Sequence, residues 1–129
     1  MLKIFIIYLF PFWCLGQQAF STLEPHDFEL ALRKNKTGIL LDLRNIESYE
    51  IAHIKNAKVV DFLRDDFKEY ILGKYAVDSS LYVYGQTASD SKNVALYLSE
   101  IGFKNINVLQ GGFENWIQKS KPYKSIKQS

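Results

Sequence analysis

The chain of 129 residues is poor in the side chains that carry thiol and metal chemistry. It has one cysteine, Cys14, and two histidines, His26 and His53. A single thiol excludes an internal disulfide, and beyond residue 14 the chain has no thiol nucleophile. Two histidines without a further cysteine make no zinc or iron site, and the scattered carboxylates do not follow the spacing of a calcium loop. We therefore expect no metal and no cofactor.

The chain also lacks a block of charge of one sign. Its 16 Lys and Arg residues and 14 Asp and Glu residues are interleaved, which argues against nucleic acid as a partner. With 47% hydrophobic and 23% charged residues the composition is globular. No linker rich in proline or glycine interrupts residues 19–118, so these residues are expected to form one domain.

The N-terminus differs from the rest of the chain. Lys3 is followed by an apolar and aromatic run over residues 4–14 that is interrupted only by Pro11. The run is shorter than the roughly 20 residues that a membrane-spanning helix needs, so we expect a signal peptide over residues 1–16 and no stable membrane span after its removal. Cleavage after Gly16 would send the protein to the periplasm or outside the cell. The alternative is an unprocessed apolar strand or helix.

Short apolar runs alternate with helical periodicity in the remaining sequence. Residues 39–43 and 81–84 are apolar without alternation, as in strands covered on both faces. A weak strand is expected at 58–62 and a last strand at 106–109. This alternation predicts an α/β fold with a mainly parallel sheet. Helices are expected from Pro25 to a stop at Gly38, over 47–52, around Phe67, Tyr70 and Ile71 to a stop at Gly73, from Ser89 to a cap at Gly102, and after Gly111-Gly112 with Phe113, Trp116 and Ile117 buried.

Two motifs flank the chain's central region. The first runs from Leu41-Asp42-Leu43-Arg44 through Glu47 and Tyr49 to His53-Ile54 and Ala57, and the second from Gly102-Phe103 through Leu109-Gln110-Gly111-Gly112 to Trp116. In this order they resemble the rhodanese-like domain family, although Ala52, Lys55 and Asn56 depart from its usual Gly, Pro and Gly. The resemblance implies a three-layer domain with about five parallel strands and helices on both faces. It covers residues 19–122 and leaves a polar tail over 123–129.

The resemblance implies a sulfurtransferase whose nucleophilic cysteine is the first residue of the loop after the strand that ends at Tyr84. A thiolate among converging backbone N–H groups at a helix N-terminus has a depressed pKa and can hold a sulfur-derived anion. Here that position is Gly85, so no catalytic residue is assigned. The vestigial active-site loop reads Gly85, Gln86, Thr87, Ala88, Ser89 and Asp90.

Asp90 is a second departure, because the family often has Arg or Lys there. A carboxylate repels anionic donors, yet in the first turn of a helix it interacts favourably with the helix dipole. The loop's N–H groups can therefore surround an empty centre that binds an anion, or Gln86 or Asp90 can fill that centre and leave only surface contacts. Asp42, Arg44 and His53 are expected to support the loop by hydrogen bonds.

Two functions follow from these residues. The first is a secreted, non-catalytic module that binds a protein partner or a small anionic ligand through the vestigial loop. The alternative is an enzyme, either a sulfurtransferase that relies on a partner's thiol or an activity that uses a hydroxyl of Thr87, Ser89 or Ser91. A hydroxyl nucleophile needs an adjacent base, and neither histidine is near the loop in sequence. The non-catalytic module is favoured.

Overall fold

A computed structural model describes residues 19–126; the predicted signal peptide lies outside them. One sheet of five parallel strands, in the order β1-β6-β5-β2-β4, forms the centre of the domain. Its strands are β1 (Ser21–Leu23), β2 (Ile39–Asp42), β4 (Lys58–Val59), β5 (Ser80–Tyr84) and β6 (Asn105–Leu109). The five-stranded parallel sheet expected from the resemblance is confirmed.

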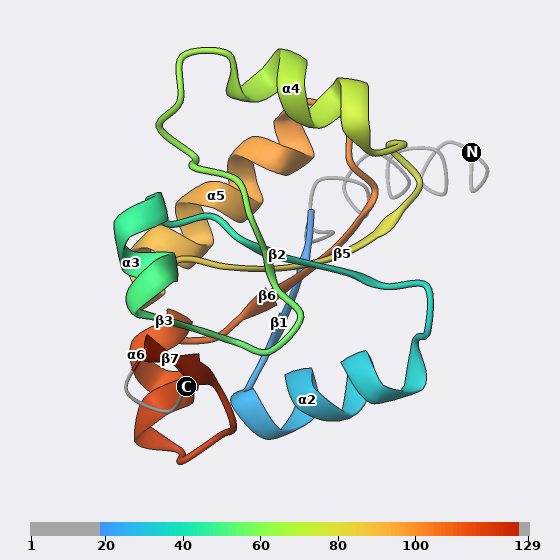
Figure 1. Cartoon of the computed structure of the whole chain (residues 1–129). Coiled ribbons are helices and arrows are strands. Elements are labelled where there is room, and N and C mark those ends of the chain that lie inside the picture. Colours follow the sequence, from blue (N-terminus) through green and yellow to red (C-terminus); the bar gives the residue numbers. More distant parts are fainter. Residues whose placement is uncertain (1–18, 127–129) are drawn as a thin grey trace, which may run out of the picture.

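Helices cover both faces of this sheet (Figure 1), because β2, β5 and β6 are apolar on both sides. On one face Leu41, Val83 and Val108 pack against α4 (Phe67–Lys74) and α5 (Ala88–Glu100). On the other face Leu40 and Tyr82 pack against α2 (Pro25–Lys34) and α6 (Gly112–Gln118). The central strands therefore have apolar runs without alternation because both of their faces are buried, as predicted.

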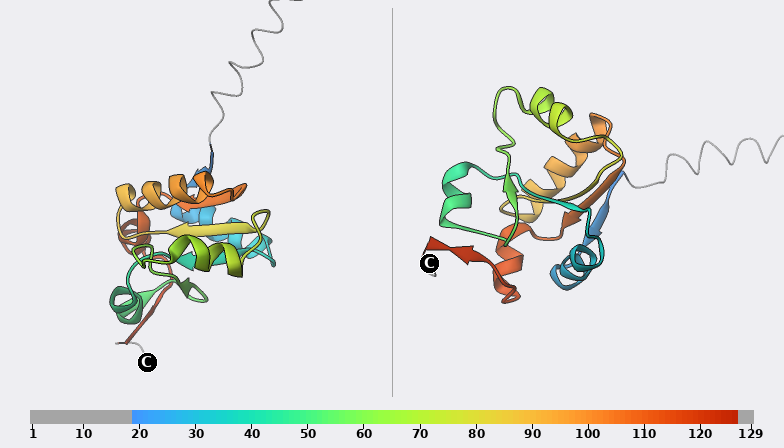
Figure 2. Two further views of the ribbon diagram at one scale, coloured as in Figure 1. Left: turned by 90° about the horizontal axis from the view of Figure 1, so that it is seen from above. Right: turned by 45° about the vertical axis from the view of Figure 1, so that its right-hand side comes forward.

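A smaller sheet lies beside the main one. After α3 (Ile46–Ile51), β3 (Ala52–His53) pairs antiparallel with β7 (Lys124–Ser125), as Figure 2 shows where the chain returns beside α3. Residues 124–125 fall in the segment predicted to be a polar tail, so this part of it belongs to the fold. The strands β1, β3 and β7 were not predicted, and the strand expected over 58–62 is shorter, since β4 ends at Val59.

Several helix boundaries and facings differ from expectation. Gly73 lies inside α4, which ends at Lys74, and the N–H of Tyr75 closes the last turn on the carbonyl of Ile71. The end of α2 is at Lys34, with Asn35 as its C-cap, so Gly38 is not its stop. Ile117 is 37% exposed rather than buried. Gly102, at φ +112°, follows α5 as predicted.

No helix within residues 19–126 is long and apolar enough to cross a membrane.

Candidate functional site

The vestigial loop lies at the carboxyl ends of β2 and β5, the edge at which parallel α/β sheets bind ligands. Gly85 is buried directly after β5, and its N–H donates to the hydroxyl of Ser91 at 3.0 Å. The helix α5 begins at Ala88, so only Gly85, Gln86 and the cap Thr87 separate it from the strand. The predicted loop residues are thus brought together at this edge.

Thr87 and Asp90 form a capping box at the start of α5. The N–H of Asp90 donates to Thr87 Oγ1 at 3.2 Å, and the N–H of Thr87 donates to Asp90 Oδ2 at 3.3 Å. Each side chain thereby satisfies a backbone donor that a helix N-terminus leaves free. The carboxylate of Asp90 thus turns back onto the loop and accepts from one of its N–H groups, that of Thr87.

Asp90 also takes the space that a side chain at position 85 would need. A Cβ built on Gly85 would lie 2.8 Å from the Cβ of Asp90 and 3.1 Å from both the carbonyl carbon of Asp90 and the backbone nitrogen of Ser91. Such separations are well inside van der Waals contact, and backbone atoms cannot give way as a flexible side chain can. The loop is therefore shaped for glycine at this position.

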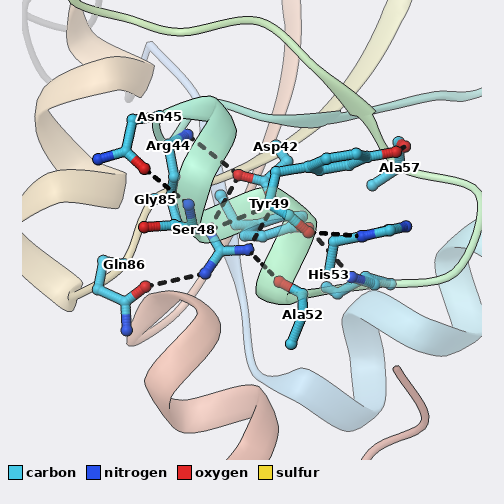
Figure 3. A network of polar contacts seen from close by, with 12 residues as sticks. Asp42, Arg44, Asn45, Ser48, Tyr49, Ala52, His53, Ala57, Gly85 and Gln86 are labelled. Carbon is cyan, nitrogen blue, oxygen red and sulfur yellow. Dashed lines mark hydrogen bonds and ion pairs between the residues drawn. The ribbon is translucent and has the colours of Figure 1, made fainter. Parts of the chain in front are cut away.

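Arg44 and Asp42 form a buried ion pair beneath the loop (Figure 3). Arg44 Nε lies 3.0 Å and Nη2 2.7 Å from the two carboxylate oxygens of Asp42, which is fully buried. The remaining donors of Arg44 reach outward: Nη2 donates to the carbonyl of Ala52 at 2.6 Å and Nη1 to Gln86 Oε1 at 3.0 Å. Asp42 and Arg44 thus support the loop through Gln86, and the bidentate geometry fixes the guanidinium plane.

Aromatic rings complete the surroundings of this ion pair. The hydroxyl of Tyr84 donates to Asp42 Oδ2 at 2.7 Å and accepts from the N–H of Ile54 at 3.1 Å. Burial, reinforced by the carboxylate of Asp42, raises the pKa of Tyr84 and keeps the phenol neutral. The guanidinium carbon of Arg44 lies 4.2 Å from the centre of the Phe113 ring, within cation–π distance.

His53 supports α3 rather than the vestigial loop. Its Nδ1 is 2.8 Å from the carbonyl oxygen of Tyr49, and its ring stacks on the Tyr49 ring with 3.8 Å between centroids. The hydroxyl of Tyr49 donates to the carbonyl of Ala57 at 2.8 Å. His53 therefore makes the structural hydrogen bond expected of it, but one element away from the loop.

The start of α6 holds the other side of the loop, which the sequence did not predict. The N–H groups of Phe113 and Glu114 donate to the carbonyls of Gly85 and Gln86 at 2.9 and 3.1 Å. Gly112, at φ +67°, lies so close that a Cβ there would be 2.7 Å from the carbonyl oxygen of Thr87. A Gly-Gly pair signals a turn in any sequence, and only the fold shows that this turn contacts the loop.

A pocket of about 480 Å³ opens beside the loop, between α3 and α5. Its apolar walls include Leu43, Phe62 and Val94, and Leu63 stands at its edge with 84% of its surface exposed. Its polar lining consists of Arg44, Asn45, Ser48, Asp61, Gln86, Asp90 and Asn93. Across residues 19–126 no three His, Cys, Asp or Glu side chains gather in a way that could hold a metal ion.

Neither histidine bonds to a hydroxyl of the loop. Ser91 is 1% exposed and accepts from Gly85, and Thr87 Oγ1 accepts from Asp90. His53 bonds to Tyr49, and His26 Nδ1 lies 3.4 Å from Lys121 Nζ. The arrangement provides a fixed loop and, beside it, a pocket with a polar lining.

Proteins similar in sequence to this chain include sulfurtransferases. The chain is 35% identical over 85 residues to the thiosulfate sulfurtransferase GlpE of Coxiella burnetii, covering 66% of this chain and 77% of that protein. It is 27% identical over 99 residues to the Candida albicans adenylyltransferase and sulfurtransferase UBA4, covering 73% of this chain, which spans only 23% of that protein's length.

Solved structures share the fold at lower sequence identity. The rhodanese-like domain of the Anabaena Alr3790 protein has a TM-score of 0.72 at 22% identity, covering 88% of this chain and 83% of that one. The polysulfide-sulfur transferase homodimer of Wolinella succinogenes has a TM-score of 0.67 at 23% identity, covering 82% and 79%. The sequence profile named Rhodanese-like domain matches residues 24–119, and the chain therefore belongs to the rhodanese-like domain family.

Proposed function

We propose that this protein is an exported, non-catalytic member of its family that binds a protein partner through the pocket beside the vestigial loop. The observation that carries the proposal is the contact between positions 85 and 90. Where the family resemblance implies a cysteine, the chain has a glycine, and the space for any side chain is taken by the Cβ and backbone of Asp90. The loop therefore lacks the thiol and also packs too closely around position 85 to leave room for a side chain there.

The charges around the pocket argue against a small anion as its ligand. The Thr87 N–H, which would face an anion, is engaged by the carboxylate of Asp90. Asp61 places a second carboxylate in the same pocket, and the guanidinium of Arg44 is paired with Asp42. An incoming anion would meet uncompensated negative charge.

The names of the relatives favour sulfur transfer as a second candidate function. Thiosulfate sulfurtransferase GlpE is the name of a protein with 35% identity to this chain. In such a transfer a thiolate takes the outer sulfur of thiosulfate and releases sulfite, and cyanide then removes that sulfur as thiocyanate. Beyond Cys14 the chain has no thiol for the first step, so a partner would have to supply it.

Thiocyanate formation by the purified full chain, from thiosulfate and cyanide, separates the two candidates. We expect no thiocyanate above the protein-free rate, with or without an added small thiol as acceptor. A matched Cys14→Ser variant establishes whether the single thiol contributes to any signal. Turnover by this variant would overturn the proposal of a non-catalytic module.

A further inference from the structure

The pocket beside Gly85 combines apolar walls with net negative charge. Arg44 lines it, but Nε and Nη2 of Arg44 bond to Asp42, so this pair is neutral as a unit. The other ionisable groups in the lining are the carboxylates of Asp61 and Asp90. The pocket therefore has a formal charge near −2, opposite in sign to a site for thiosulfate.

Each of these carboxylates is held in place and keeps an oxygen for a ligand. Asp61 Oδ1 accepts from the N–H of Leu63 at 2.9 Å, and Asp90 Oδ2 accepts from the N–H of Thr87. In both side chains the second oxygen makes no hydrogen bond within residues 19–126. The two carboxylates are thus positioned by the backbone, and no cation among the described residues bonds to them.

The apolar side of the pocket suits an alkyl stem and a flat cation. Phe62 is fixed by edge contacts to Phe67 and Tyr97, with ring centroids 5.1 and 5.5 Å apart. Leu43 and Val94 are 4% and 3% exposed and form the inner wall, whereas Leu63 stands exposed at the edge. Arginine offers three methylene groups followed by a planar cation that stacks on aromatic rings and bonds carboxylates in pairs.

From this charge complementarity we infer that the pocket binds the guanidinium group of an arginine in a segment of the protein partner. The inference rests on the proposed function and names its ligand chemistry. The guanidinium bonds to the free oxygens of Asp61 and Asp90, and the side-chain amides of Asn45 and Asn93 are available to the peptide backbone around it. The aliphatic part of the side chain lies against Phe62 and Leu63.

The test is an amide-resolved NMR titration of the full chain with the peptide acetyl-Ala-Arg-Leu-amide. A second peptide has citrulline in place of arginine, which keeps the shape and removes the charge, and a third has lysine. We expect the arginine peptide to shift the backbone amides of Asn45, Gln86 and Asn93, and the citrulline peptide to bind about tenfold more weakly, as expected for two exposed ion pairs.

Variants of the pocket carboxylates provide the matched comparison. The double change Asp61→Asn with Asp90→Asn keeps an oxygen for the N–H groups of Leu63 and Thr87, so the fold is retained. It should remove the preference for arginine over citrulline. Asp27→Asn, a neutralised carboxylate in the first turn of α2, should leave that preference unchanged.

The outcomes separate this inference from the function on which it rests. Equal binding of the arginine and citrulline peptides, or an unchanged preference in the double variant, overturns the arginine site. Shifts of the same amides by thiosulfate but not by the peptide also overturn it and leave a non-catalytic anion-binding module. Thiocyanate formation in the transfer assay overturns the proposed function itself.

Discussion

The Cβ of Asp90 lies where a side chain at Gly85 would have to start. The Cα of Gly85 faces the Cβ of Asp90 across the first turn of α5, and a Cβ at position 85 would come within 2.8 Å of it. Asp90 is held there by its capping interaction with Thr87, and Gly85 is held by its N–H bond to Ser91. The absence of a side chain at position 85 is thus linked to the position of the Cβ and backbone of residue 90.

This relationship predicts that Gly85→Ala destabilises the protein by about 1–3 kcal/mol, the usual cost of forcing an extra carbon into a packed site. The cost should fall in an Asp90→Gly background, because the atom nearest the added Cβ is then gone. Urea unfolding of the four proteins in the double-mutant cycle measures the coupling. Additive effects would contradict the steric relationship.

Restoration of sulfur transfer should therefore need more than one change. We expect Gly85→Cys alone to form no thiocyanate from thiosulfate and cyanide, since its Cβ would come within 2.8 Å of the Cβ of Asp90 and the carboxylate of Asp90 would repel thiosulfate. Gly85→Cys with Asp90→Gly removes the closest of these contacts and the repelling charge, and it is expected to show measurable turnover. Full activity in the single variant would show that the loop rearranges freely.

The capping box makes a separate contribution to stability. Thr87→Ala removes the acceptor for the Asp90 N–H and should cost about 1 kcal/mol, the typical value for an N-cap residue. Ser89 lies two residues further on and is exposed, so Ser89→Ala is the control and should be close to neutral. Thermal or urea unfolding measures both, and equal effects of the two changes would argue against the cap.

Loss of one partner of the buried Asp42–Arg44 ion pair should lower the unfolding free energy more than loss of the cap. Arg44→Leu leaves the carboxylate of Asp42 uncompensated at 0% exposure, and we expect a loss of about 3–5 kcal/mol in unfolding free energy. Adding Asp42→Asn should recover part of this loss. Arg33→Leu removes an exposed guanidinium that lies 3.6 Å from Glu29, and it should change stability by less than about 1 kcal/mol.

Much of this domain could be predicted from local sequence patterns. The apolar runs at β2 and β5 and the helical spacing of Val94, Leu98 and Ile101 define buried strands and a helix wherever they occur. The capping role of Asp90 was also accessible, because Thr87 and Asp90 are three residues apart. These signals act within one or two turns of chain.

The rest depends on contacts that local patterns do not encode. Arg44 meets Gln86 across 42 residues, and Phe113 lies below its guanidinium from the far end of the chain. Gly112 was predicted to turn the chain, and its contact with the loop depends on the placement of α6 against β5. The pocket likewise combines Asp61 with Asp90 only after the strands are ordered.

The end of the chain provides the clearest case of a contact hidden from the sequence, and it supports a further prediction. The indole N–H of Trp116, which is 2% exposed, donates to the carbonyl of Pro122 at 2.9 Å. Tyr123 packs edge-on against Phe113, with 6.1 Å between centroids, and Phe113 in turn contacts Arg44. The segment after residue 121 is therefore connected through two rings to the buried ion pair.

A chain that ends at Lys121 should accordingly lose at least about 2 kcal/mol of stability, because a buried indole donor is left without its acceptor and Phe113 loses a packing partner. A chain that ends at Ile126 keeps Pro122, Tyr123 and β7 and is the matched control. Amide exchange should report the effect at the site, since loosening of Phe113 weakens its N–H bond to the carbonyl of Gly85. If both truncated chains exchange at Phe113 at the same rate, the C-terminal segment does not support the loop, and the ion pair and the start of α6 hold it without that help.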